Sequence, residues 1–371
     1  MTRAPRIGLV LGGGGVIGNA YLTGVLEGLR RVSGWDPAAA RITVGTSAGS
    51  VNGAFTALGV PTELIFRYVT GERLPDDVFP GAAIRLRERR DDHWTERLYK
   101  PTGMLPRPFL SSPRCMLQAV LRPWETSLEL FVAGLLGEGM MSTRTIGELI
   151  EAVQPSGWPE RTFWAVAVDL ESGARVAFGR DDAPRTDVAR AVRASCAIPA
   201  FFAPVRIGGR RYVDGGIWSV SNLDLVAGLG LDLVVCVNPM SSLEGRSYEG
   251  PVDRITAAIH EGERRAKIRF GRRLGWERRL VEDSGTSVLL IQPTAADLEV
   301  IPVNLMRASE RRAVAQRALE TAIAALETRA DWQPALRLLR AAGTHADAGV
   351  PAAVAARAAG AHDAHEGGRV A

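Results

Sequence analysis

The segment RIGLVLGGGGVIGNAYLTGVL, Arg6 to Leu26, places four consecutive glycines between a short apolar run and a segment with apolar residues at helical spacing. A compact apolar run bounded by glycine is typical of a buried strand. A glycine loop between a strand and a helix presents backbone N–H groups at the positive end of that helix, where an anion binds well. The loop therefore predicts either a bound phosphate or an oxyanion that forms during a reaction.

The segment RITVGTSAGSVNGAFTAL, Arg41 to Leu58, repeats the order of strand, turn and helix. Its turn matches G-x-S-x-G, with Gly45 and Gly49 two residues on either side of Ser47, in the strand–turn–helix context that this motif requires. Such a tight turn exposes the serine hydroxyl next to the N-terminus of the following helix. The motif predicts a nucleophile at Ser47; the alternative is a chance match in which the serine is an ordinary N-cap.

Four later apolar runs are also expected to be strands, and helical patterns lie between them. They are Phe163–Leu170, Ala174–Gly179, Leu231–Pro239 and Ser287–Pro293. Strands that alternate with helices predict an α/β fold with a mainly parallel central sheet and helices on both faces.

Two regions do not fit this alternation. Residues of about 74–141 are rich in Pro, Arg and Trp without a clear period, and predict an irregular cap-like insertion. Within it, the apolar stretch 128–141 predicts either a buried core helix or a lid beside the site. Residues 329–371 are Ala-rich and predict a largely disordered tail. We therefore expect one catalytic domain over residues 1–328.

A serine nucleophile needs a base, and histidine is the usual one. The five histidines, His93, His260, His345, His362 and His365, are scattered over segments that position none of them beside Ser47. Asp214 is a second candidate, because it follows the short strand RRYV and precedes Gly215 and Gly216. Glycines next to a carboxylate allow close backbone approach, although an ordinary Asp-Gly turn is the alternative. Burial next to a hydroxyl would raise the pKa of Asp214 and make it a better base.

Together these motifs resemble the patatin-like phospholipase family. Its pattern is a glycine loop after the first strand, then G-x-S-x-G, then D-G-[AG], and here the three motifs read GGGVIG (Gly13–Gly18), GTSAG (Gly45–Gly49) and DGG (Asp214–Gly216). The run ASCAIPAFFAPVRIGGRRY before the last motif is similar to the family as well. The resemblance implies a fold related to three-layer α/β hydrolases.

The resemblance also implies a mechanism without histidine, cofactor or metal. Ser47 would be the nucleophile and Asp214 its base, and the N–H groups of Gly13, Gly14 and Gly15 would form the oxyanion hole. The substrates would be acyl esters of lipids, as for a phospholipase A, lysophospholipase or esterase. One position departs from the family, which often has Arg or Lys where this chain has Ile17.

Two other functions remain open on the sequence. Gly13, Gly15 and Gly18 also satisfy the dinucleotide fingerprint G-x-G-x-x-G, but the acidic residue that it expects at the end of the second strand is absent there. Asp36 has about the right spacing but precedes that strand. A catalytically silent regulator or scaffold with the same fold is the other alternative, and intact Ser47 and Asp214 argue against it.

Composition and charge indicate where the protein acts. The chain has 371 residues, 46% hydrophobic and 23% charged, with a net charge of +4. Its three cysteines lack disulfide or metal spacing, no run is apolar enough to span a bilayer, and no signal peptide is recognisable, so we expect a cytoplasmic protein. The basic segment 260–279 predicts a surface helix; contact with an anionic membrane is the alternative, and no pattern for nucleic-acid binding accompanies it. The oligomeric state is not indicated.

Overall fold

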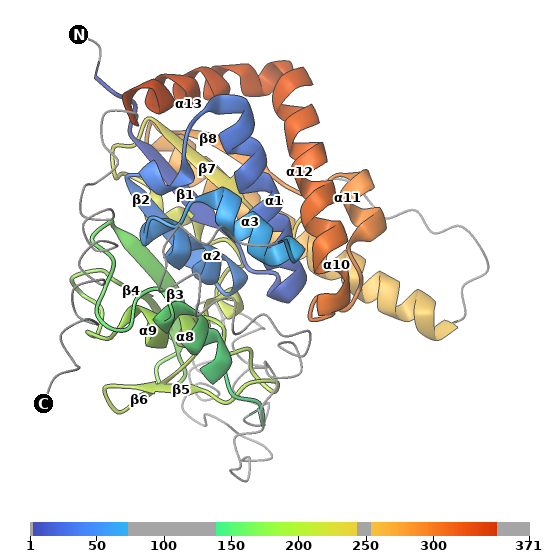
Figure 1. The fold of residues 1–371 in the computed structure, drawn as a ribbon. Coiled ribbons are helices and arrows are strands. Elements are labelled where there is room, and N and C mark those ends of the chain that lie inside the picture. Colours follow the sequence, from blue (N-terminus) through green and yellow to red (C-terminus); the bar gives the residue numbers. More distant parts are fainter. Residues whose placement is uncertain (1–2, 73–138, 243–253, 347–371) are drawn as a thin grey trace, which may run out of the picture.

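The computed structural model describes residues 3–72, 139–242 and 254–346. Its centre is a sheet of eight strands in the order β5-β6-β3-β2-β1-β7-β8, with β4 paired to β3 off this path (Figure 1). The strands are β1 (Ile7–Leu11), β2 (Ile42–Thr46), β3 (Phe163–Asp169), β4 (Arg175–Phe178), β5 (Val205–Ile207), β6 (Arg210–Asp214), β7 (Leu233–Val237) and β8 (Ser287–Ile291). The predicted strands are confirmed, with ends that differ by a few residues.

The centre of the sheet is parallel and one end is antiparallel. β8, β7, β1, β2 and β3 pair in parallel, whereas β4 and β6 are antiparallel to β3, and β5 is antiparallel to β6. The predicted fold, a mainly parallel α/β sheet, is confirmed. The glycine loop and the Ser47 turn follow β1 and β2, which are neighbours, so both lie at the carboxyl edge of the sheet, where open α/β folds bind their ligands.

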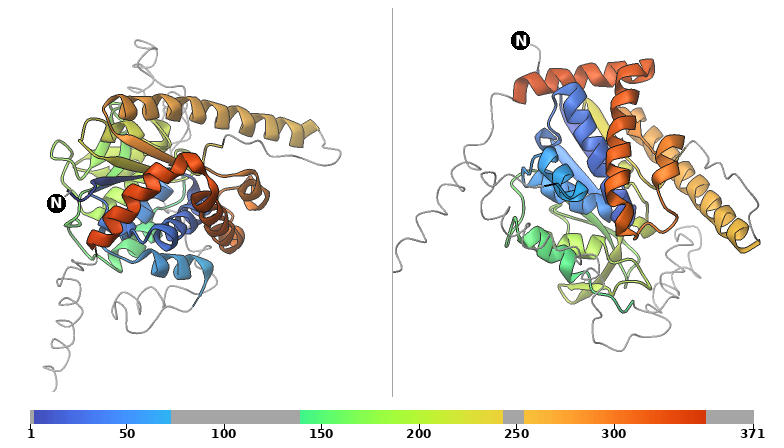
Figure 2. Two further views of the ribbon diagram at one scale, coloured as in Figure 1. Left: turned by 90° about the horizontal axis from the view of Figure 1, so that it is seen from above. Right: turned by 45° about the vertical axis from the view of Figure 1, so that its right-hand side comes forward.

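Helices cover both faces of the sheet. They are α1 (Gly15–Ser33), α2 (Ala48–Ala57), α3 (Thr62–Thr70), α8 (Arg144–Glu151), α9 (Val188–Ser195), α10 (Arg254–Asp283), α11 (Ala295–Val300), α12 (Arg311–Thr328) and α13 (Gln333–Ala346). Alternate strand residues face opposite layers: Leu9 and Leu11 pack with α1 and α12, whereas Val10 packs with Leu274 and Val281 of α10. Figure 2 shows α10 across the sheet from α1 and α12.

Small residues bring α1 and α12 close together. A Cβ on Gly24 would overlap the Ala315 carbonyl, and one on Gly28 would lie 3.1 Å from the Ala322 Cβ. Close packing of this kind leaves little room for α1 to shift. It therefore fixes the position of the glycine loop at the N-terminus of α1.

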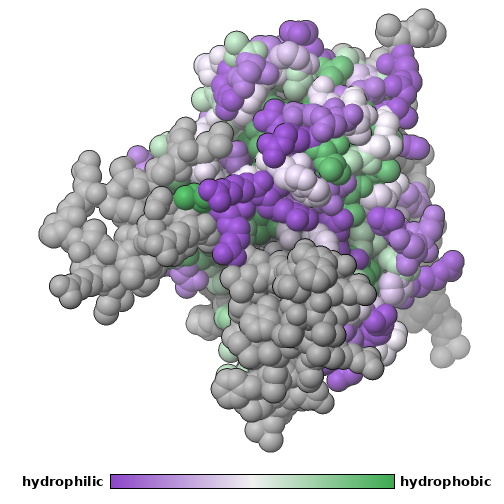
Figure 3. Space-filling view, turned by 180° about the vertical axis from the view of Figure 1, so that it is seen from behind, coloured by the Kyte–Doolittle hydropathy of each residue, from purple (hydrophilic) through white to green (hydrophobic). Residues whose placement is uncertain are grey.

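The predicted basic helix at 260–279 is confirmed as part of α10. Figure 3 shows the molecule from behind, where hydrophilic side chains run across the surface with apolar surface between them. Leu274 and Val281 are buried against the sheet, whereas Ile268, Trp276 and Leu280 are exposed. Membrane contact by this helix stays a prediction. Among the helices of the described segments, none combines the length and the apolar character that crossing a bilayer requires.

The prediction of a tail from residue 329 is wrong for its first part. Residues Ala330–Trp332 form a 3-10 turn, and α13 follows it. Trp332, Leu336 and Leu339 are buried in the core around α1. Their spacing of four and three residues is helical, but the many alanines and arginines around them conceal it. The insertion at 74–141, except for its last three residues, and residues 347–371 lie outside the described residues.

Candidate active site

Ser47 lies in the turn between β2 and α2. Its φ of 52° and ψ of −120° are outside the regions that residues with side chains usually adopt, and strain of this kind is concentrated at functional sites. Glycines allow the turn to be so tight: a Cβ on Gly45 would overlap the Gly49 carbonyl, and one on Gly49 would overlap the Leu11 carbonyl. The Ser47 turn therefore has the geometry that G-x-S-x-G predicts.

Strand β3 brings the end of β6 against the end of β2. β4 pairs along Ala165–Val168 of β3, while β2 pairs with the first part of that stretch and β6 with the second. A strand has two edges, so β2 and β6 must share the edge that β4 leaves open. Thr46 ends β2 opposite Val166, and Asp214 ends β6 opposite Ala167, the next residue. The two strands meet end to end, and the turn after β2 lies beside Asp214.

Asp214 is a buried carboxyl, with 5% of its surface exposed. Its Oδ1 accepts a hydrogen bond of 2.7 Å from the Gly216 N–H, whereas Oδ2 has no partner of strict hydrogen-bond geometry within the described residues. Burial raises the pKa of Asp214 from 3.8 to about 6, while the nearby Ser47 side chain and the Gly216 N–H limit the rise. The predicted increase in pKa is confirmed. A carboxylate of this basicity can accept a proton from an adjacent hydroxyl near neutral pH.

Gly215 makes this approach of β6 to β3 sterically feasible. A Cβ on Gly215 would overlap the Val166 carbonyl of β3, so a larger residue would push Asp214 away from the Ser47 turn. The expectation that a glycine after Asp214 allows close backbone approach is therefore confirmed for Gly215.

The glycine loop borders the Ser47 turn, since a Cβ on Gly13 would lie 3.4 Å from the Ser47 Cβ. The Gly13 N–H, however, donates a hydrogen bond of 2.8 Å to the Val220 carbonyl. Because an N–H group has one hydrogen, the expectation that Gly13 contributes an open donor requires correction. The N–H groups of Gly14 and Gly15 have no hydrogen-bond acceptor among the described residues.

The first turn of α1 is covered by the segment before α12. The Ile17 N–H donates to the Leu305 carbonyl at 2.9 Å, and a Cβ on Gly15 would lie 2.8 Å from Met306 Sδ. Gly15 has a φ of 62°, which favours glycine. Ile17 is 1% exposed and packs in the core, so its side chain replaces the family's basic residue without adding a charge. Gly18 follows, and a Cβ added to it would lie 3.4 Å from the Pro239 Cβ.

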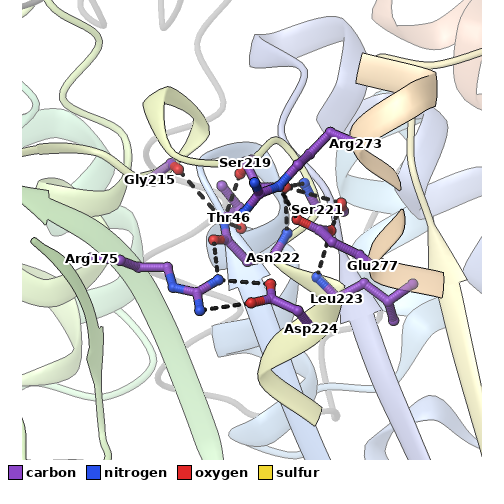
Figure 4. A network of polar contacts seen from close by, with 10 residues as sticks. All are labelled: Thr46, Arg175, Gly215, Ser219, Ser221, Asn222, Leu223, Asp224, Arg273 and Glu277. Atoms are coloured by element: carbon purple, nitrogen blue, oxygen red, sulfur yellow. Dashed lines mark hydrogen bonds and ion pairs between the residues drawn. The ribbon is translucent and has the colours of Figure 1, made fainter. Parts of the chain in front are cut away.

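A polar network fixes the loop that follows Asp214 (Figure 4). Asn222 Nδ2 donates to Thr46 Oγ1 at 3.0 Å and to the Ser219 carbonyl at 2.6 Å. Arg175 of β4 donates to Asn222 Oδ1 at 3.2 Å and forms a two-pronged ion pair with Asp224. Two-pronged pairs restrict geometry strongly. The loop is thereby tied to the end of β2 and to β4.

Helix α10 anchors the same loop from the other side. Glu277 is fully buried, accepts hydrogen bonds from Ser221 Oγ at 2.6 Å and from the Leu223 N–H at 3.0 Å, and pairs with Arg273 (Figure 4). These contacts also fix Val220, whose carbonyl holds the glycine loop. A buried carboxylate with several donors is well satisfied and therefore rigid.

An apolar cavity opens beside Ser47 and encloses about 950 Å³, its open mouth included. Most of the lining residues come from α1, α2, α3 and α8. The lining residues are Gly15, Val16, Asn19, Ser47, Ala48, Val51, Phe55, Ile65, Tyr68, Val69, Ile146, Leu149, Cys196, Ile198, Phe202, Met306 and Arg311. A cavity that is mostly apolar with a few polar groups is suited to a small apolar ligand.

Within the described residues, no histidine side chain and no metal-ligand cluster is placed at this site. The side chains of all five histidines lie outside the described residues, so the structure places none of them. The described residues contain no cluster of three or more potential metal ligands. Cys196 and Cys236 are buried and unbridged, as expected, whereas Cys115 lies outside the described residues.

Comparison with known proteins identifies the family. The sequence profile of the patatin-like phospholipase family matches residues 9–227. The chain belongs to this family. The matched region contains the glycine loop, the Ser47 turn and Asp214 with the loop that follows it.

Curated relatives are similar to this chain over part of their length. Uncharacterized NTE family proteins of Mycobacterium bovis and Mycobacterium tuberculosis are 28% identical over 246 residues, which are 66% of this chain and 52% of theirs. An uncharacterized protein of Bacillus subtilis is 29% identical over 225 residues, which are 57% of this chain and 63% of its own. The chain thus spans about half the length of the mycobacterial relatives. Among solved structures, VipD from Legionella pneumophila aligns over 88% of this chain and 67% of its own, with 15% identity and a TM-score of 0.37.

Sequence reasoning missed several residues of this patatin-like site. Ser195 contacts the Ser47 backbone, Val220 holds Gly13, and Asn222 links the loop to β2. Ser195 lies within the run ASCAIP, which is similar to the family's sequence. The sequence therefore pointed to this run but did not indicate what its serine does. Val220 acts through its backbone carbonyl, which every residue has, so its residue type does not indicate this role.

Proposed function

We propose that this chain hydrolyses acyl esters of lipids, with Ser47 as the nucleophile and Asp214 as its base. The observation that carries this proposal is the strained Ser47 turn beside a buried carboxyl of raised pKa, at the wall of an apolar cavity. A nucleophile next to a base is the arrangement that covalent catalysis requires. Family membership supports acyl hydrolysis of lipids in general.

The proposed reaction has two stages, acylation and deacylation, each with two proton transfers. Asp214 Oδ2 takes the Ser47 Oγ proton as Oγ attacks the ester carbonyl, and the protonated Asp214 then gives that proton to the departing alcohol. Water hydrolyses the acyl-enzyme in the same way: Asp214 accepts a proton from the water and returns it to Ser47 Oγ when the fatty acid leaves. The cavity beside Ser47 would hold the acyl chain.

The N–H groups of Gly14 and Gly15 are proposed to hold the tetrahedral oxyanion, together with the positive end of α1. Gly13 would support them indirectly, because its bond to Val220 fixes the loop. Two donors aimed at a developing negative charge contribute on the order of 3 kcal/mol each to the transition state. A basic residue is not required for this function, which is consistent with Ile17.

The alternative of dinucleotide binding is not supported by the glycine loop. A dinucleotide's pyrophosphate would need the free N–H groups of the first turn of α1. There the Ile17 N–H is already bonded to the Leu305 carbonyl. A catalytically silent scaffold stays an alternative that only an activity measurement excludes.

A lipid panel tests the proposal. We expect wild-type protein to release fatty acid from at least one class among phospholipids, lysophospholipids and glycerides, and Ser47→Ala to release none above background. Release is followed by mass spectrometry of the free fatty acid. If wild type and Ser47→Ala behave alike on every lipid, the proposed function is wrong.

Replacing Gly15 by alanine is expected to lower kcat for a short p-nitrophenyl ester by on the order of tenfold or more. The added Cβ would lie 2.8 Å from Met306 Sδ and 3.0 Å from the Leu305 carbonyl, which displaces the Gly15 N–H. Gly34→Ala is the matched control, because Gly34 also has a positive φ, of 73°, and no atom within 4 Å of its added Cβ. Both variants should lose about 1 kcal/mol of stability from backbone strain, and only Gly15→Ala should lose activity. Equal activities would contradict the proposed role of the loop.

Filling the cavity is expected to change chain-length preference. Val51 lies one turn from Ser47 on α2 and lines the cavity. Val51→Phe should lower kcat/KM for p-nitrophenyl palmitate about tenfold or more relative to p-nitrophenyl acetate. The phenyl ring would exclude methylene groups of the palmitoyl chain from the cavity, and their burial would no longer favour the reaction. Val32→Phe, at the far end of α1, should leave the ratio unchanged. An unchanged ratio in Val51→Phe would show that the acyl chain lies elsewhere.

A further inference from the structure

The hydrogen-bond ladder between β2 and β3 stops where the chain turns at Ser47. The Thr43 N–H donates to the Thr162 carbonyl at 2.9 Å, and in a parallel ladder such bonds recur at every second residue of each strand. Four residues further on, the donor in this series would be the Ser47 N–H and the acceptor the Val166 carbonyl. The strained turn at Ser47 interrupts the series at this rung.

Ser195 closes the interrupted rung with its side chain. The Ser47 N–H donates to Ser195 Oγ at 2.9 Å, and Ser195 Oγ donates to the Val166 carbonyl at 2.6 Å. Ser195 is the last residue of α9 and is completely buried. One hydroxyl therefore stands between the two backbone groups that a straight strand would join directly. Both groups are satisfied although β2 has begun to turn away.

The two residues after Ser195 hold other backbone groups of the site. Cys196 Sγ donates to the Ser47 carbonyl at 3.4 Å, and the Ala197 carbonyl accepts the Asp214 N–H at 3.0 Å. The segment Ser195–Ala197 thus contacts the backbones of both residues that we propose for catalysis. Within this segment, the serine hydroxyl is the group that both accepts and donates a bond of 2.9 Å or less.

We propose that Ser195 is a positioning residue for Ser47. Its hydroxyl holds the Ser47 backbone at the angle that directs Oγ toward Asp214, in place of the missing rung of the sheet. Without it, the Ser47 N–H and the Val166 carbonyl would both be buried without a partner, and the turn would shift until one of them found one. This inference rests on the proposed function, because the effect of the shift on rate requires Ser47 to be the nucleophile.

The test compares Ser195→Ala and Ser195→Cys with a matched control. Ser33→Ala removes a buried hydroxyl that makes the same pair of bonds, from the Trp35 N–H at 3.1 Å and to the Leu29 carbonyl at 2.6 Å, at the other end of α1. We expect Ser195→Ala to lower kcat for p-nitrophenyl butyrate on the order of tenfold to a hundredfold with KM within about threefold, as a displaced nucleophile does. Ser195→Cys, whose thiol bonds weakly, should be intermediate.

Stability alone does not account for this pattern, because Ser33→Ala should lower Tm by a similar amount and leave kcat unchanged. Hydrogen exchange measures the turn without activity: the Ser47 amide should exchange at least about tenfold faster in Ser195→Ala than in wild type or Ser33→Ala. Wild-type kcat and an unchanged Ser47 amide in Ser195→Ala would overturn the inference. If wild type shows no activity that depends on Ser47, the proposed function fails, and the exchange of the Ser47 amide alone decides whether Ser195 holds the turn.

Discussion

Replacing Ser47 by alanine is expected to lower kcat for p-nitrophenyl butyrate by at least about 10⁴-fold, because the acyl-enzyme cannot form without the hydroxyl. The protein should remain folded, since the Ser47 side chain is not among the groups that hold the sheet. The turn is held instead by backbone bonds to Ser195 and Cys196, which alanine keeps. Steady-state kinetics and a thermal melt on the same preparation measure both effects.

Ser47→Gly is the control for strain at the same position. Glycine should be as inactive as alanine but more stable by about 1 kcal/mol or more, because a φ of 52° with a ψ of −120° costs less without a Cβ. A Ser47→Ala variant that keeps more than about one hundredth of wild-type kcat would show that another group is the nucleophile.

Replacing Asp214 by asparagine is expected to abolish activity and to stabilise the protein. Burial raises the pKa of Asp214 from 3.8 to about 6, so the folded protein holds this proton more tightly than the unfolded chain does. Below pH 3.8 the protonated Asp214 imposes no charge penalty. The free energy of unfolding therefore falls as the pH rises from 3.8 to about 6. Above pH 6 the buried carboxylate destabilises the fold by up to about 3 kcal/mol.

Asparagine carries no charge to bury, so Asp214→Asn should recover part of this free energy at pH 8 and little at pH 4. It should also lower kcat about 10³-fold or more, because the amide cannot accept the Ser47 proton. Urea unfolding at the two pH values measures the difference. Asp297→Asn is the control, since Asp297 is also buried with a raised pKa but caps α11, where its loss should leave kcat unchanged. A stability gain that is the same at pH 4 and pH 8 would contradict the assigned pKa.

The parallel strands were predictable because buried parallel strands are short apolar runs between turn residues. The glycines around Ser47 and Asp214 were predictable for a related reason. Gly49 and Gly215 each lie where a Cβ would overlap a carbonyl of a neighbouring strand, so the requirement falls on the residue type itself. Where packing allows only glycine, as at these two positions, the residue type itself indicates the close contact.

Contacts made by backbone atoms left no such record. The Val220 carbonyl occupies the Gly13 N–H, yet any residue at position 220 has a carbonyl. Ser195 is one serine among many until the β2–β3 register shows which rung it replaces. α13 was missed for another reason, since Trp332 and Leu336 anchor it within an Ala-rich stretch whose composition predicts disorder.

The catalytic pair is tested most directly by the rate at which a fluorophosphonate probe labels the protein across pH, with the modified peptide identified by mass spectrometry. The account predicts one adduct, on Ser47, and a second-order rate constant that rises with pH through an apparent pKa of about 6 and is then constant, because the ionised Asp214 must take the Ser47 proton. Asp214→Asn should label at least about 10²-fold more slowly, with no transition near pH 6. An adduct on another residue, or labelling of Asp214→Asn at the wild-type rate, would contradict the Ser47–Asp214 pair.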